Sequence, residues 1–176
     1  MPRIGEEIVN PRTGQRMTFI ELREEVVRID SVNPPSSVRE PEHVHPKQES
    51  GAEVISGSLV FEVAGRKRQL DAGQAITVPP NTPHRFWNDG RADARSIQFF
   101  RPALDIGSFF ETLFALADRG QLNDEGMPQV LQLMAMVPEF ADEIRPTTPP
   151  WPVLRVVAAV LAPIAHLRGY RGRLEL

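Results

Sequence analysis

The stretch EPEHVHPKQESGAEVISG, residues 40–57, decides the fold together with GQAITVPPNTPHRFWN, residues 73–88. These stretches hold His43, His45 and His84, three of the four histidines in the chain. Side chains two residues apart on a β-strand share a face, so both imidazoles of the first pair can converge on one point. Prolines bracket that pair, and proline is disfavoured inside a helix. The pattern predicts a metal pocket built on β-strands.

Outward from the histidines, short runs rich in valine, isoleucine and phenylalanine extend from Met17 to about Phe100, separated by turn signals. About eight or nine antiparallel strands are expected there, as in a sandwich or barrel. After Pro102, apolar residues recur at helical spacing. We therefore expect a barrel with N-terminal strands in residues 1–102 and a helical extension in residues 103–176, which packs on the barrel or on a second subunit.

The extension is predicted to hold three helices. The first lies in residues 106–120 and ends at a glycine, and the second begins near Pro128. The third lies in residues 152–169, after a proline-rich connector. The third is apolar on all sides, so we expect it to be buried and the protein to be a homodimer. Its apolar run, interrupted by Arg155 and Pro163, falls short of the roughly 20 residues that span a bilayer.

Composition narrows the class of protein. With 176 residues, of which 41% are hydrophobic, the chain suits one main domain. A net charge of -3 and scattered arginines exclude a basic field for nucleic acid. Without cysteine, any metal must be held by nitrogen and oxygen ligands. The N-terminal residues carry no secretory signal pattern, so we expect a cytoplasmic protein.

The second stretch resembles a signature motif of the cupin superfamily, GxxxxxPxGxxHxxxN. The residues in place are Gly73, Pro79, His84 and Asn88. Asn81 stands where the family has a glycine. That glycine position suits a positive φ, which asparagine tolerates better than most residues.

The first stretch resembles the other cupin motif, in which a glutamate follows the HxH pair and a glycine ends the motif. Gly57 is present, and Ser37 replaces the leading glycine. Counting back from Gly57 puts the glutamate at Ser50, whereas counting forward from His45 by the shorter spacing puts it at Glu49. Adjacent residues of a regular strand face opposite ways, so Glu49 reaches a metal only if the strand bulges. The fourth ligand is thus Glu49, Ser50 or neither, with Gln48 as a weak oxygen ligand.

The resemblance covers residues 37–101 and is greatest to single-domain, conserved-barrel (type 2) cupins. It implies a mainly β fold, a double-stranded β-helix or jelly-roll barrel, here with a C-terminal α-helical extension. It also implies a divalent transition metal (Fe, Mn, Zn, Ni or Cu). The implied ligands are His43, His45, His84 and Glu49.

Residues near the third histidine are candidates for substrate contact. Phe86 and Asn88 share the face of His84 by strand alternation and are expected to point into the barrel, while the residues between them face outward. Gln98 lies in an otherwise apolar strand, where a buried amide needs a partner, so it is a third candidate.

Three functions fit these residues. The first is a metal-dependent enzyme that acts on a small organic substrate in dioxygenase, isomerase or lyase chemistry. The second is a non-catalytic cupin that binds or senses a small molecule. The third is a metal-free epimerase with His43 or His84 as the base, which requires an acid across the pocket. Tyr170 is the only tyrosine that could supply this acid.

Overall fold

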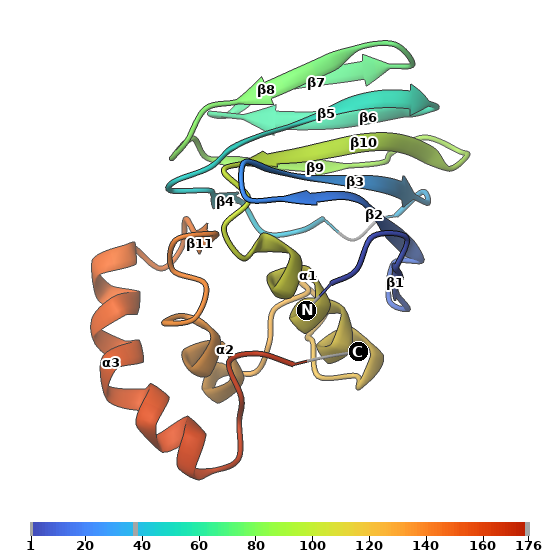
Figure 1. Ribbon diagram of the computed structural model, residues 1–176. Helices are drawn as coiled ribbons and strands as arrows, with labels where there is room; N and C mark the ends of the chain where they lie inside the picture. The colour runs from blue at the N-terminus through green and yellow to red at the C-terminus, as the bar shows by residue number, and fades with distance from the viewer. Residues whose placement is uncertain (1, 37–38, 175–176) are drawn as a thin grey trace.

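Two antiparallel β-sheets face each other in the computed structural model, and three helices lie together on one side of them (Figure 1). The structure describes residues 2–36 and 39–174, so Ser37 lies outside the described residues. The mainly β barrel with a C-terminal helical part, predicted from the sequence, is confirmed.

The first sheet has six strands with β10 near its centre. In spatial order they are β1 (Glu7–Asn10), β2 (Gln15–Arg23), β3 (Val26–Asn33), β10 (Ala94–Arg101), β5 (Glu49–Ser56) and β8 (Ala75–Val78). The second sheet has five. They are β11 (Arg145–Pro146), β4 (His43–Val44), β9 (His84–Trp87), β6 (Ser58–Val63) and β7 (Arg66–Asp71).

Strand alternation builds the interior of the barrel. In β3 and β10, every second residue is buried, as expected when one face of a strand meets the core. Val54, Leu59, Phe61 and Leu70 fill one core between the sheets. Asn81 has a φ of 59°, so the positive φ expected at this glycine position of the motif is confirmed.

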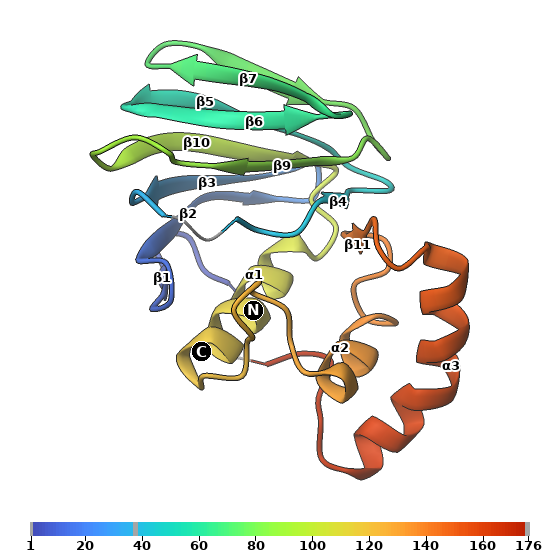
Figure 2. The same cartoon turned by 180° about the vertical axis from the view of Figure 1, so that it is seen from behind.

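The extension begins after Pro102 with α1 (Ile106–Asp118), followed by α2 (Val130–Met136) and α3 (Trp151–Leu167). Helix α1 packs against the first sheet, where Ile106 and Phe114 join Phe19 and Ile29 in one core. Seen from behind, the three helices again lie on the same side of both sheets (Figure 2). The described helices include none long and apolar enough to span a membrane.

Helix α3 differs from the expected all-round burial. Leu154, Ala158, Ala162 and Ala165 are buried. Leu154 and Ala158 share a core with Met134 of α2. The larger side chains Val153, Val156, Val160 and Leu167 are exposed. A single chain covers only one stripe of the helix, because α2 is the element packed against it.

Between α2 and α3 the chain returns to the barrel and forms the short strand β11. It pairs with β4, with Arg145 opposite Val44 and Pro146 opposite His43. The sequence pattern did not predict this strand, because a two-residue strand shows no periodicity.

Candidate metal centre

The structure brings His43, His45 and His84 together at one end of the second sheet. His43 lies on β4 directly opposite His84 of β9, and His45 follows on the same face of the chain. One ligand atom from each of the three imidazoles lies within 4.8 Å of the others. The ring centroids are 4.6 to 5.2 Å apart. Among the described residues, these three make a cluster of metal-ligand spacing.

Each imidazole uses Nδ1 for a hydrogen bond to a backbone carbonyl. His43 contacts Pro41 O at 3.0 Å, and His84 contacts Thr82 O at 2.8 Å. His45 contacts Glu143 O at 2.6 Å. A carbonyl oxygen only accepts, so Nδ1 of each neutral ring carries the proton and Nε2 keeps its lone pair. The three rings are thus held in the tautomer that offers Nε2 to a metal.

Burial keeps the three histidines neutral. Desolvation, and after it the neighbouring imidazole of His84, together lower the pKa of His45 to about 4, although the hydrogen bond to the Glu143 carbonyl acts in the opposite direction. The pKa of His43 is lowered well below its usual value, first by desolvation and then by the other two histidines. Desolvation also lowers the pKa of His84. A neutral imidazole is the form that coordinates a metal.

A segment of the extension, residues 143–147, fixes the histidine strand from outside the barrel. The Glu143 carbonyl accepts a hydrogen bond from His45, and β11 pairs with β4. In addition, both N and Oγ1 of Thr147 donate to Glu42 O at 3.2 Å. The Glu143 carboxylate accepts a bond from Asp105 N at 3.1 Å and is buried. We call residues 143–147 the clamp segment. It makes the extension part of the site.

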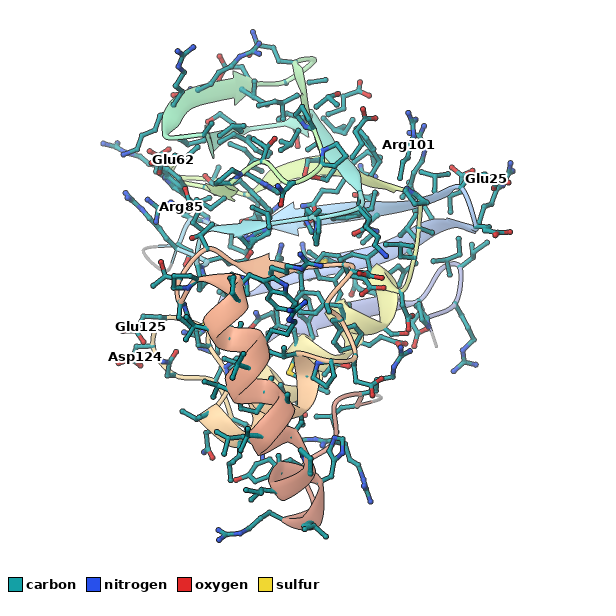
Figure 3. The ribbon with its side chains drawn as sticks, turned by 90° about the vertical axis from the view of Figure 1, so that its left-hand side faces the viewer. Glu25, Glu62, Arg85, Arg101, Asp124 and Glu125 are labelled. Atoms are coloured by element: carbon teal, nitrogen blue, oxygen red, sulfur yellow. The ribbon has the colours of Figure 1, made fainter. Side chains whose placement is uncertain are left out.

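The expected fourth ligand, Glu49, is not brought to the histidines. Strand β5 pairs without a bulge at this point, with Glu49 opposite Arg101 of β10 and Ser50 opposite Phe100. The Glu49 carboxylate is 3.9 Å from the Arg101 guanidinium, which lies on the outer side of the barrel (Figure 3). Strand alternation therefore turns Glu49 out and Ser50 in.

The Gln48 side chain is bound through its amide nitrogen, and its Oε1 has no hydrogen-bond partner among the described residues. Its Nε2 donates to Pro102 O and Ala103 O at 2.9 and 2.8 Å, and the side chain is fully buried. These bonds tie the histidine loop to the start of the extension. Within the described part of the chain, Gln48 is not among the residues that line the cavity beside the histidines.

A cavity of about 170 Å³ opens beside the histidines. Phe86 and Gln98, two of the expected substrate contacts, line it. Gln98 is 5% exposed, and its Nε2 has no hydrogen-bond partner among the described residues. An unpartnered buried donor is costly, so this atom is available to a ligand oxygen.

Asn88, the third expected contact, lies elsewhere. Its Nδ2 donates to Asn33 O and Ala92 O, and its Oδ1 accepts from Gly90 N. It lines a separate, smaller pocket with Trp87. Strand β9 ends at Trp87, one residue before Asn88. The Asn88 side chain therefore holds the turn after the strand and does not line the cavity.

Glu40 lines the cavity and was not singled out from the sequence. Burial raises the pKa of this carboxyl, and Arg12, which also lines the cavity, opposes the shift. Nothing in the local pattern separates Glu40 from the glutamates that follow it, because its partner Arg12 comes from the distant β1–β2 turn. Tyr170, required by the epimerase hypothesis, is not among the described residues that line the cavity.

Part of this chain is similar to known proteins. Residues 32–100 match the family model described as Cupin domain. Over 61 residues the chain is 34% identical to polyketide synthase CurC of Streptomyces cyaneus, a match that spans 35% of this chain and only 40% of that relative.

Two solved structures are similar to part of this chain. An RmlC-like cupin from Shewanella frigidimarina NCIMB 400 has a TM-score of 0.51 at 21% identity, over 57% of this chain and 87% of that one. KdgF from Halomonas sp. has a TM-score of 0.49 at 22% identity, over 58% of this chain and 98% of that one. At such identities the likeness concerns the fold.

Proposed function

The barrel of this chain is a cupin domain, and we propose that it binds a divalent transition metal and acts as a metal-dependent enzyme on a small organic substrate. One observation carries the proposal: one ring nitrogen from each of the three imidazoles lies within 4.8 Å of the others beside a cavity, while each Nδ1 is held by a carbonyl. Three histidines from two neighbouring segments of the chain leave an open side for a substrate oxygen. Histidine nitrogens accept Fe, Mn, Zn, Ni or Cu.

A divalent metal held there supplies Lewis acidity or, if redox-active, dioxygen chemistry, so dioxygenase, isomerase and lyase reactions all fall within the proposal. The protein contributes the rest. Gln98 Nε2 donates to a substrate oxygen and orients it. Glu40, whose pKa burial raises, gives or takes a proton from the cavity wall. The surrounding phenylalanines exclude water.

The relative CurC is named a polyketide synthase. Polyketides are carbon skeletons with regularly placed oxygens, and such a molecule suits a cavity with a polar end and apolar walls. The match spans less than half of that relative, so this substrate class is part of the proposal.

Elemental analysis by mass spectrometry tests the metal site. Protein purified without an affinity tag is compared with His43→Ala and His84→Ala, and His166→Ala serves as the matched control because His166 is exposed on α3. We expect near-stoichiometric metal in the wild type and the control, and none in the other two. A wild type without metal even after reconstitution contradicts the proposal.

A non-catalytic sensor is the second candidate, and Ser50 favours it. A serine stands on the inward face of β5, where counting back from Gly57 puts the carboxylate of the motif, and among the described residues no carboxylate joins the three histidines. Turnover of any substrate at a rate that depends on His84 and on Glu40 would exclude this reading. A ligand that binds without turnover supports it.

Two further expectations stay predictions. They are the homodimer, which is supported by the exposed valines of α3, and the cytoplasmic location. The expected partner is a small molecule and not a nucleic acid, in keeping with the net charge of -3.

A further inference from the structure

Barrel and extension line one cavity together. The barrel contributes the three histidines, Ser50 and Gln98, together with the charged side chains of Arg12 and Glu40 and several apolar residues. The extension contributes fifteen residues of the lining, most of them with apolar side chains such as Phe109, Leu113, Leu133 and Trp151. Glu125 is the single charged side chain that the described extension adds. It lies on the loop before α2, at the outer edge of the molecule below the barrel (Figure 3).

A row of aromatic rings runs along the wall from the metal centre into the extension. Phe100 contacts His45 with ring centroids 5.2 Å apart, and Phe110 follows at 5.6 Å from Phe100. Phe109 lies 5.6 Å from Phe110 and 5.5 Å from Phe140. All four phenylalanines line the cavity. We call Phe100, Phe110, Phe109 and Phe140 the aromatic row.

The two ends of the cavity therefore differ in chemistry. At the barrel end, the unpartnered Gln98 Nε2 and the histidine cluster can both bind an oxygen atom of a ligand. At the extension end, the aromatic row and the aliphatic side chains of α2 form an apolar wall that suits a flat hydrocarbon. Aromatic rings favour edge-to-face and offset contacts with other rings. A small hydrophilic molecule such as a free sugar would leave this second end unfilled.

We propose that the cavity takes an aromatic or polyunsaturated molecule that carries a hydroxyl or carbonyl oxygen at one end. The oxygen lies against Gln98 and the histidine cluster, and the ring system lies along the aromatic row. This inference rests on the proposed function and names its substrate class. The extension is then the determinant of specificity, because it supplies three of the four rings of the aromatic row.

Isothermal titration calorimetry on the full chain tests the ligand class with three matched probes: 2-naphthol, its saturated analogue decahydro-2-naphthol, and naphthalene. We expect 2-naphthol to bind and the saturated analogue to bind about twofold to tenfold more weakly, through loss of aromatic contacts. Naphthalene is expected to bind weaker by a similar factor, through loss of the hydrogen bond. Equal affinity for the three probes overturns the inference.

Two variants locate the probe. Leu133→Trp fills the extension end and is expected to weaken 2-naphthol binding at least tenfold, whereas Val160→Trp on the exposed face of α3 is the control and leaves it unchanged. Gln98→Met removes one of the two partners of the ligand oxygen at similar volume and is expected to reduce the preference for 2-naphthol over naphthalene. If Leu133→Trp does not fold, an unchanged preference in Gln98→Met by itself contradicts the inference.

Metal analysis of the same samples separates the two proposals. A wild type that binds 2-naphthol but holds no metal contradicts the proposed function and leaves the ligand class standing. A wild type that holds metal but binds all probes equally, or binds 2-naphthol unaffected by Leu133→Trp, contradicts only the ligand class.

Discussion

At the scale of single residues, His45 shows how the site controls protonation. Its Nδ1 is held by the Glu143 carbonyl, and burial lowers its pKa to about 4, while the unfolded chain has an ordinary histidine. Between the ordinary value of about 6.5 and about 4, the unfolded state binds more protons than the folded state. The lowered pKa therefore decreases the free energy of unfolding of the metal-free protein as the pH falls through this window. Above the window it has no effect on stability.

The first prediction follows from this sign. The free energy of unfolding of the metal-free protein, measured by urea titration, is expected to decrease from pH 7 to pH 5. Each buried histidine contributes up to about 1.4 kcal/mol per pH unit to this slope. His45→Gln has a shallower slope, because it removes one of the titrating groups. If His45→Gln has the same slope as the wild type, His45 does not cause this pH dependence.

Asn81 carries the second prediction. It has a φ of 59°, and its N–H donates to His45 O at 2.8 Å, so the turn helps to position the histidine strand. Asn81→Val is expected to lower the unfolding free energy by about 1–2 kcal/mol or more, since branched residues resist this conformation. Asn81→Gly, the matched control, is expected to stay within about 0.5 kcal/mol of the wild type. Urea midpoints decide between them.

At the scale of elements, the clamp segment connects the extension to the metal centre. Outer partners that orient a ligating histidine typically change metal affinity by about 10–100-fold when they are lost. The Glu143 side chain anchors the clamp through Asp105 N, whereas Glu139, a short distance earlier in the chain, is bonded to the exposed Arg173. The pair therefore separates an effect on the clamp from a general loss of charge.

The third prediction uses that pair. Glu143→Ala is expected to lower metal affinity about tenfold, because the loosened segment no longer holds His45 Nδ1 in place. Glu139→Ala is expected to leave the affinity unchanged. Competition with a chromophoric chelator measures both, and equal affinities in the two variants show that the clamp does not orient the ligand.

At the scale of the whole molecule, α3 presents its larger apolar side chains outward. Val156 and Val160 are both 63% exposed, and the helix carries no acidic residue. The fourth prediction is that the protein sediments as a dimer, and that the double variant Val156→Lys with Val160→Lys sediments as a monomer, because like charges then face each other across the interface. Val130→Lys on α2, which is 66% exposed, is the control. A monomeric wild type in analytical ultracentrifugation contradicts the dimer.

Local pattern in the sequence determined the barrel, the convergence of His43, His45 and His84, the positive φ of Asn81 and the limits of the helices. Each depends on periodicity, turn chemistry or motif spacing, which neighbouring residues carry. Tertiary structure decided the rest. It turned Glu49 outward, bound Asn88 into a turn, placed Glu40 beside Arg12 and brought residues 143–147 back to the histidine strand. These contacts join segments up to about a hundred residues apart, and the spacing of residues along a chain does not say which distant faces will meet.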